Sequence, residues 1–456
     1  MEVLEARLLL SFSNITAALG FDRVGGGLDG ASHSGFGDIN NDGWTDLNWG
    51  SAIWVNNAGN SFTFLQQLPG EGLFGDFDND GLLDVMADWW NAGKLFRNVN
   101  GTKFVDDGLV TGPYKYSRGA TAGDFNNDGF LDAYTGGYWD EVQYFPDHLI
   151  MSNGGTSYTT TEVSGSTMPT RGVTAADFDE DNDLDVYLSW YHLLANVLLQ
   201  NNGSGGFTNM ASSYGATGGN GHSIGAAWGD IDNDGHMDLF AGNFAHPGQP
   251  ESRWLRNQGP VDVGDDYTFE DMGTGGVVWK ESFASPSLGD YDNDGDLDLF
   301  FTTVYGGDSS VLYRNDGNWT FTNVTTDEGL PGVTSTYQNA WGDYDNDGDL
   351  DLVFGGRLYR NDLDNSNNWL KLLLKGDPAQ GINAAAIGAV ARIDLGGGEV
   401  LTRQVEGGTG EGNQNDLVLH FGLGGYSGSV DVEITWPGGL TKTYSVLINR
   451  MVEVTV

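Results

Sequence analysis

The sequence predicts an all-β protein, a seven-bladed β-propeller followed by a small β-sandwich-like domain. A nine-residue acidic motif, Asp-x-Asp/Asn-x-Asp-Gly-x-x-Asp with Asn once in place of Gly, recurs seven times. Its spacing ranges from 38 residues (38 to 76) to 60 residues (230 to 290), a period typical of four-stranded propeller blades. Alternating apolar runs with Gly and Asn turns separate the motifs, and no long stretch has a helical period.

Each repeat contains the same four expected strands, as the fifth repeat illustrates. A strand of small residues, 224–228, leads into the motif. An apolar strand, 237–241, leaves it. A third strand ends in Leu-Arg-Asn at 255–257, and an Asn/Gly-rich turn leads to a fourth strand centred on an aromatic residue, 267–269. Period-2 alternation between such turns indicates antiparallel β structure.

The two ends of the repeat array are expected to close the ring. The last repeat supplies three strands before the sequence changes character near Asp362, and residues 8–15 resemble the missing fourth strand. Pairing them removes exposed strand edges. We therefore expect the propeller to span residues 1–364. Residues 365–456 lack the acidic motif but alternate as strands, and they are expected to form a small separate β domain.

The repeated motif has the chemistry of a calcium loop. Oxygen side chains at positions one, three, five and nine, with the backbone carbonyl of position seven, suit a hard cation, and Gly at position six permits a positive φ. The sequence therefore predicts up to seven Ca²⁺ ions. The expected ligand residues are Asp38, Asn40, Asp42, Trp44 and Asp46; Asp76, Asp78, Asp80, Leu82 and Asp84; Asp124, Asn126, Asp128, Phe130 and Asp132; Asp177, Asp179, Asp181, Asp183 and Asp185; Asp230, Asp232, Asp234, His236 and Asp238; Asp290, Asp292, Asp294, Asp296 and Asp298; and Asp343, Asp345, Asp347, Asp349 and Asp351.

An alternative interpretation is that Asp and Asn only favour turns. Turn preference does not require the ninth-position Asp, which is present in all seven copies, so metal binding is favoured. Loops one and three carry Asn40 and Asn126 at position three, and their lower charge predicts weaker binding. Catalytic use of these carboxylates is not expected, because calcium in such loops braces the connection between two strands.

Composition restricts the partners and the compartment. The net charge of −44 disfavours nucleic acid, whose phosphates need a basic face. There is no cysteine, and the apolar runs are of strand length, so no transmembrane segment is expected. No signal peptide is visible in the first residues, although one could have been trimmed. Because weak calcium loops fill where calcium is near millimolar, the protein is expected to be secreted or on the cell surface.

The motif-bearing repeats resemble FG-GAP/VCBS repeats, the calcium-loop blades also found in integrin α-subunit propellers. The tail is similar to the ASPIC/UnbV domain, on residues 383–390, 419–424 and 436–439. Together they resemble the cartilage acidic protein family and its bacterial relatives over nearly the whole chain. The resemblance implies secretion, calcium binding and an extracellular or surface role. The chain departs from animal members in lacking their cysteine-bearing module.

Aromatic and His residues follow the second strands of many repeats, on the face expected to lie opposite the calcium loops. Rings flanked by polar groups stack on sugars or grip a peptide, and concave propeller faces bind ligands. Trp90, Trp139, Tyr191 and His246 are therefore expected to contact an extracellular glycan, a protein or another copy of the chain. The alternative is that these rings pack between blades. Loops entering the first strands share the face, with His33, Glu71, Arg118, Arg171, His222, Lys280 and Gln338.

The sequence favours a non-catalytic extracellular role in adhesion, recognition or surface and matrix structure. The Gly-x-Ser-x-Gly match at 221–225 precedes a strand and lacks the strand–turn–helix context of a hydrolase. Two alternatives stay open: a carbohydrate lyase or dehydratase at the central channel, and a subunit of a self-assembling extracellular fibre. An enzyme should bring His, Arg and carboxylate groups together at the channel mouth with perturbed pKa values.

Overall fold

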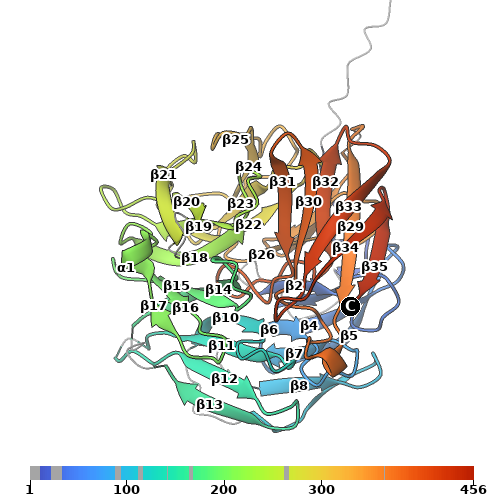
Figure 1. Ribbon diagram of the computed structural model, residues 1–456. Coiled ribbons are helices and arrows are strands. Elements are labelled where there is room, and N and C mark those ends of the chain that lie inside the picture. The colour runs from blue at the N-terminus through green and yellow to red at the C-terminus, as the bar shows by residue number, and fades with distance from the viewer. Residues whose placement is uncertain are drawn as a thin grey trace, which may run out of the picture.

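The computed structural model describes residues 11–21, 33–87, 94–110, 117–140, 142–163, 168–260, 267–363 and 365–456. Within these ranges the regular secondary structure is almost entirely β-strand (Figure 1); its helical elements include a short α-helix, α1 (Ala211–Tyr214), and a 3₁₀ helix, η2 (Pro378–Gln380). The prediction of an all-β propeller is confirmed.

The described strands of the repeat region form seven antiparallel four-stranded sheets. Their members are β2 (Ser34–Gly37), β3 (Asp46–Trp49), β4 (Ala52–Asn56) and β5 (Phe62–Gln67); β6 (Gly72–Gly75), β7 (Asp84–Ala87), β8 (Lys94–Asn98) and β9 (Phe104–Asp106); β10 (Ser117–Gly123), β11 (Asp132–Gly137), β12 (His148–Ser152) and β13 (Tyr158–Glu162); β14 (Thr170–Ala176), β15 (Asp185–Trp190), β16 (Val197–Gln200) and β17 (Thr208–Asn209); β18 (His222–Gly229), β19 (Asp238–Phe244), β20 (Arg253–Pro260) and β21 (Tyr267–Gly273); β22 (Phe283–Gly289), β23 (Asp298–Thr303), β24 (Val311–Asn315) and β25 (Phe321–Asn323); and β26 (Asn339–Gly342), β27 (Asp351–Phe354), β28 (Arg357–Asn361) and β1 (Phe12–Asn14).

The first strands of the sheets make a closed circuit. β2, β6, β10, β14, β18, β22 and β26 contact one another in that order, and β26 returns to β2. The N-terminal strand β1 is the outermost strand of the last sheet, where Phe12 lies opposite Asn361 of β28. Each acidic motif connects a first strand to a second strand, and its ninth Asp is the first residue of the second strand in all seven sheets. All seven motifs therefore lie at one end of the ring.

The C-terminal strands form two further sheets that pack against the ring (Figure 1). One sheet contains β32 (Leu419–Gly424), β29 (Asn368–Lys375) and β35 (Met451–Thr455). The other contains β31 (Glu399–Gln404), β30 (Val390–Gly396), β33 (Ser429–Thr435) and β34 (Thr441–Leu447). Alternate residues such as Val430, Val432 and Ile434 face inward and are buried. Their hydrophobic core is continuous with Phe77 and Leu131 of the propeller, so the C-terminal region does not stand apart from the ring.

The C-terminal sheets dock on the end of the ring that carries the acidic motifs. Gly422 N donates to Asp290 Oδ2 at 3.0 Å, and Val400 N donates to the carbonyl of Asn233 at 2.8 Å. Lys371 Nζ lies 2.8 Å from Asp343 Oδ2, with both side chains buried. This face of the propeller is consequently an interface within the chain.

A glycine-rich segment of the C-terminal region, residues 406–416, fills the centre of the ring and is called here the channel loop. It hydrogen-bonds to the first strand of every sheet. The contacts are Ala122 N to Gly407 O, Thr174 Oγ1 to Gly408 O, Gly410 N to Ala226 O, Glu411 N to Ser285 Oγ, Asn339 N to Asn413 Oδ1, Gln414 N to Ser34 O and Phe74 N to Gln414 Oε1.

The small residues of the first strands make room for the channel loop. A Cβ on Gly172 would lie 2.7 Å from the carbonyl of Gly410, and a Cβ on Gly225 would lie 2.9 Å from its Cα. A Cβ on Gly407 would lie 1.7 Å from the carbonyl of Ala122. Because neither side can accept a side chain, the sequence needs glycine on both. The channel loop therefore packs closely against the first strands β10, β14 and β18.

Candidate functional site

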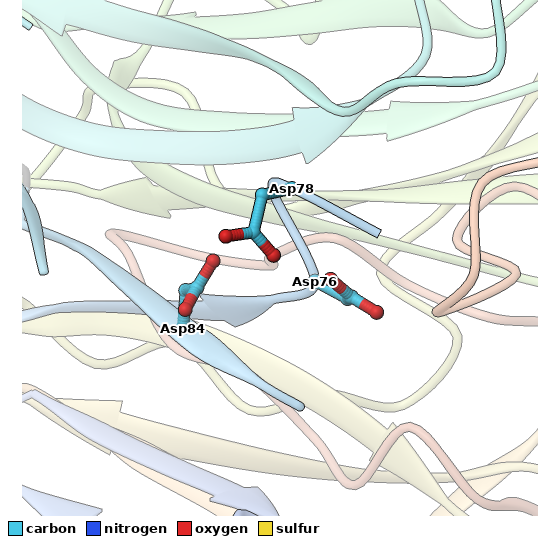
Figure 2. A group of neighbouring side chains, drawn as sticks. All are labelled: Asp76, Asp78 and Asp84. Atoms are coloured by element: carbon cyan, nitrogen blue, oxygen red, sulfur yellow. The ribbon is translucent and has the colours of Figure 1, made fainter. Parts of the chain in front are cut away.

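In five of the seven loops, three of the four carboxylates expected as ligands lie close together. In loop two, Asp76, Asp78 and Asp84 place ligand oxygens within 4.8 Å of one another at the turn from β6 to β7 (Figure 2). The corresponding groups in loops four to seven are Asp177, Asp179 and Asp185; Asp230, Asp232 and Asp234; Asp290, Asp292 and Asp294; and Asp343, Asp345 and Asp347. Loops one and three differ at position three, where Asn40 Nδ2 and Asn126 Nδ2 donate to the position-five carboxylates.

The backbone wraps around the first carboxylate of each motif. In loop two, Asp80 N and Gly81 N donate to the two oxygens of Asp76 at 3.0 and 2.7 Å. Position six has a positive φ in all seven loops, including Asn182 at 72°, as predicted. Position four also has a positive φ throughout, as at Asn79 with 59°. The sequence indicates this conformation by the Asn at position four in six of the seven copies.

The ninth Asp of each motif accepts hydrogen bonds that connect the first three strands of its sheet. Asp84 accepts Phe77 N at 3.3 Å on Oδ2 and Asn98 N at 2.7 Å on Oδ1, and the same pair of backbone donors recurs in the other six sheets. The Asn98 side chain donates to Leu83 O and to Ile39 O of the neighbouring blade. The Asn that ends the third strand of this blade therefore links the blade both to its own motif and to the neighbouring blade.

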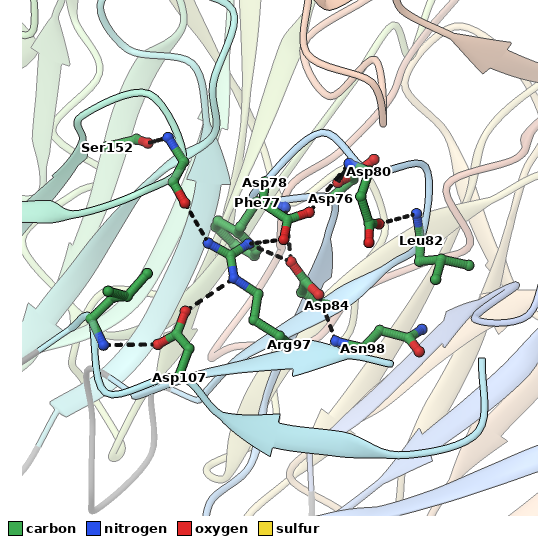
Figure 3. A network of polar contacts seen from close by, with 12 residues as sticks. Asp76, Phe77, Asp78, Asp80, Leu82, Asp84, Arg97, Asn98, Asp107 and Ser152 are labelled. Carbon is green, nitrogen blue, oxygen red and sulfur yellow. Dashed lines mark hydrogen bonds and ion pairs between the residues drawn. The ribbon is translucent and has the colours of Figure 1, made fainter. Parts of the chain in front are cut away.

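Packing several carboxylates in a buried turn is electrostatically unfavourable without a cation. Burial raises the pKa of Asp46 to about 8 and that of Asp84 to about 7, and neighbouring carboxylates add to both increases. Part of the charge is balanced by Arg97, whose Nη1 lies 2.7 Å from Asp84 and 3.5 Å from Asp78 (Figure 3). Arg256 balances charge in the same way in loop five, where its Nε lies 2.6 Å from Asp232 Oδ2.

The donor set fits a divalent cation. Oδ1 of the position-three carboxylate is buried without a hydrogen-bond partner in loops four to seven, at Asp179, Asp232, Asp292 and Asp345. A buried carboxylate oxygen without a donor costs free energy. A hard cation coordinated among positions one, three and five would satisfy these oxygens and offset the repulsion between the carboxylates.

The opposite end of the ring carries the predicted ligand residues. Trp90 lies outside the described residues. Trp139 and Tyr191 are half-buried, and His246 is exposed with 47% of its side chain accessible. Other rings connect them: Trp139 lies 5.4 Å from His192, and Tyr191 lies 4.6 Å from His222, between ring centroids. The resulting aromatic belt spans three neighbouring blades and continues from His222 to His246 at 6.0 Å.

The tip of the channel loop reaches the same end. Glu411 Oε1 accepts Arg171 Nε at 2.6 Å and Arg118 Nη1 at 3.1 Å. Glu411 is fully buried. The guanidinium of Arg171 lies 5.5 Å from the Tyr138 ring centroid and 5.4 Å from that of Tyr191. Sequence analysis placed both arginines on this face but missed the carboxylate, because Glu411 comes from the C-terminal region.

The surroundings lower the pKa values of two histidines of this group. Burial and the charge of Arg171 lower the pKa of His192, and burial with the neighbouring His192 and His246 lowers that of His222. Burial raises the pKa of Tyr191. Neutral imidazoles can donate or accept hydrogen bonds, so this end of the ring combines polar donors, acceptors and flat apolar faces.

The other polar residues of the loops that enter the first strands do not all lie together. Gln338 Nε2 donates to the Glu411 carbonyl at 3.2 Å, which places it with the arginines. His33 is buried, its backbone N–H donates to Glu71 Oε2 at 3.2 Å, and burial lowers its pKa to about 3. Lys280 lies 3.9 Å from Asp308. The structure therefore gathers Arg118, Arg171, His222 and Gln338, and leaves His33 inside the ring.

Comparisons with known proteins match both parts of the chain. The FG-GAP-like repeat family matches residues 76–135, 194–241 and 290–354, and the ASPIC and UnbV family matches residues 379–455. Cartilage acidic protein 1 of Xenopus tropicalis is 29% identical over 265 residues, which are 55% of this chain and 39% of that protein. The mouse protein is 27% identical over 270 residues, 56% of this chain and 40% of its own length.

Solved structures resemble the chain more distantly. A lectin of Agrocybe aegerita that recognises terminal N-acetylglucosamine is 16% identical, with a TM-score of 0.43 over 66% of this chain and 84% of its own. Virginiamycin B lyase of Staphylococcus aureus is 11% identical, with a TM-score of 0.44 over 76% and 97%. Among the described residues, no helix is long and apolar enough to cross a membrane. The chain is thus built of FG-GAP-like repeats and an ASPIC/UnbV domain, and it is homologous to cartilage acidic protein 1.

Proposed function

We propose that the protein is a secreted or surface-exposed calcium-binding propeller, residues 1–364, whose C-terminal domain, residues 365–456, docks on the calcium loops. The opposite face recognises an extracellular glycan or protein in adhesion, recognition or matrix structure. The single observation that carries calcium binding is the set of buried position-three oxygens without partners, at Asp179, Asp232, Asp292 and Asp345. FG-GAP-like repeats and the homology to cartilage acidic protein 1 support an extracellular repeat protein.

The recognition face is supported by its exposed and half-buried rings. Trp139, Tyr191 and His246 are accessible at the end of the ring that the C-terminal domain leaves uncovered. A glycan microarray probed with the calcium-loaded chain, and with a Trp139→Ala/Tyr191→Ala variant, tests this role. We expect binding to be lost while calcium-dependent melting is kept. If the variant instead unfolds, the rings are inter-blade core.

A second candidate is an enzyme acting on carbohydrate at the channel mouth. The specific observation in its favour is the convergence of His192 and His222, whose pKa values burial lowers, with Arg171 and the Glu411 carboxylate. Incubation with acidic polysaccharides, followed by ultraviolet detection of unsaturated products, tests a lyase. Product that disappears in a His222→Ala variant would favour catalysis over simple binding.

A further inference from the structure

The fourth residue of each acidic motif reaches the next motif around the ring. It stands between positions three and five, whose oxygens are expected ligands. Its side chain contacts position six or seven of the following loop in all seven cases. The contacts are Asn41 Nδ2 to Gly81 O, Asn79 Nδ2 to Gly129 O, Asn127 Nδ2 to Asp183 Oδ1, Glu180 Oε1 to His236 Nδ1, Asn233 Nδ2 to Asp296 Oδ1, Asn293 Nδ2 to Gly348 O, and Asn346 Nδ2 to Gly43 O. The last contact returns from loop seven to loop one, so the contacts form a closed ring.

These contacts are made at the part of the loop that supplies the expected carbonyl ligand. Position six makes the turn, and the backbone carbonyl of position seven is expected to bind the ion. In four of the links the donor holds the position-six carbonyl, as Asn79 Nδ2 does at Gly129 O, 2.8 Å away. That peptide group immediately precedes the residue whose carbonyl is the expected ligand. The position-four side chain therefore positions part of the neighbouring loop's site.

The C-terminal sheets hold the same carbonyl in two loops where the preceding loop contacts position seven instead. Arg392 Nε donates to Gly235 O of loop five at 3.4 Å. Arg403, which is buried, donates from Nη2 to Gly295 O of loop six at 3.1 Å. A side chain from outside the loop thus holds the position-six carbonyl in both of these loops as well. The orientation of this peptide group depends on neighbouring segments, and not on the nine-residue motif alone.

We propose that calcium binds the seven loops with positive cooperativity, which the position-four side chain of each loop transmits to the next. The inference rests on the calcium binding proposed above. An ion that holds positions three and five also orders position four between them, and so fixes the donor to the following loop. That loop then loses less conformational entropy when it binds its own ion. By linkage, the second ion strengthens binding of the first by the same factor.

The link between loops one and two offers the clearest test. Asn41 is exposed, so Asn41→Gly removes the donor to Gly81 O without leaving a cavity, and glycine tolerates the φ of 55°. Asn220→Gly is the matched control, because Asn220 is exposed, has a φ of 59° and lies at the opposite end of the ring, before β18. The probe is calcium alone, titrated into the full chain. Amide hydrogen exchange of residues 38–46, measured by mass spectrometry, gives the calcium concentration at which loop one is half protected.

Loop two has one carboxylate more than loop one and is expected to fill first. Asp80→Ala removes an exposed carboxylate of loop two. It should raise the half-protection concentration of loop one at least about fivefold, the lower end of ordinary coupling between sites. In the Asn41→Gly background the same substitution should not change that concentration, whereas in the Asn220→Gly background its full effect should persist. Residues 290–298 of loop six, three loops away, should shift much less.

Three results would contradict the coupling while leaving the calcium sites intact. The first is an unchanged loop one in Asp80→Ala. The second is an equal shift in loops one and six, which indicates a general loss of stability. The third is a full effect of Asp80→Ala in the Asn41→Gly background, which shows that position four does not transmit it. If no loop of the native chain gains protection with calcium, the proposed calcium binding itself fails, so the two failures are distinguishable.

Discussion

Arg171 Nε donates to Glu411 Oε1 at 2.6 Å across 240 residues of sequence. The arginine lies on β14 of the propeller, and the carboxylate is carried through the ring by the C-terminal region. This contact joins the end of the ring that carries the acidic motifs, where the C-terminal sheets dock, to the opposite end, which carries the aromatic belt. Two faces that the sequence presents as unrelated are therefore connected by one loop.

Removing the Glu411 carboxylate should destabilise the protein strongly. In Glu411→Ala, Arg171 stays buried and loses its carboxylate partner, and breaking a buried ion pair costs about 3–5 kcal/mol of unfolding free energy. Urea unfolding in calcium measures the loss. The control is Glu453→Ala, whose exposed pair with Lys375 should contribute less than about 1 kcal/mol. Equal losses in the two variants would show that the channel loop is not anchored at its tip.

Steric fit in the channel gives a second prediction. Gly407→Ala places a Cβ 1.7 Å from the Ala122 carbonyl, so either the loop or β10 must shift. Such overpacking lowers the free energy of unfolding by roughly 1–3 kcal/mol. Gly425→Ala is the matched control, because its Cβ would meet nothing within 4 Å. Melting temperatures of the two variants should differ clearly, and a Gly407→Ala protein as stable as the control would contradict the observed path of the channel loop.

Sequence reasoning found the strands because their signals are local. The ninth Asp of each motif and the small residues of β18 lie where the periodicity placed them. The channel loop was missed because its partners are distant: Gln414 bonds to Phe74 across 340 residues, and no local pattern encodes such a contact. The available signal was the run at 406–416, where glycines alternate with polar residues that prove buried, such as Thr409 and Asn413.

Only part of the candidate site could be predicted from the sequence, for the same reason. The positions expected to bind metal follow from the spacing within the motif. The grouping of Tyr191 with His192, His222 and Arg171 instead depends on which blades are neighbours. Sequence analysis could place these residues on one face but not beside one another. Docking of the C-terminal sheets on the acidic loops was not anticipated, since Lys371 shows no pattern that points to Asp343.

Glu406, at the base of the channel loop, should make stability depend on pH. Burial raises its pKa to about 7. A raised pKa means that the folded state prefers the protonated form, so stability is lost as pH rises from the ordinary Glu value towards 7. Glu406→Gln removes this pH-dependent contribution to stability. The unfolding free energy of the variant relative to the native chain should therefore rise across that interval and level off above it. A difference that is constant with pH would contradict the assignment.

Calcium affinity should follow the charge of each loop. Loops one and three, with Asn40 and Asn126, should lose metal first as calcium falls, because each has one carboxylate fewer. Asp232→Ala should empty loop five alone. Metal occupancy across a calcium titration, followed by crystallography or by native mass spectrometry of single-loop variants, measures the order. Earlier loss from loops six and seven would contradict the charge argument.

The central claim is that calcium braces the propeller, and thermal melting with and without chelator tests it most directly. At about 1 mM calcium, a loop with a dissociation constant of about 0.1 mM contributes roughly 1.4 kcal/mol, and seven independent loops contribute on the order of 10 kcal/mol. That sum is comparable with the net stability of a domain. The account predicts a large fall in melting temperature on chelation that added calcium reverses. An unchanged melting curve after verified metal removal would contradict it.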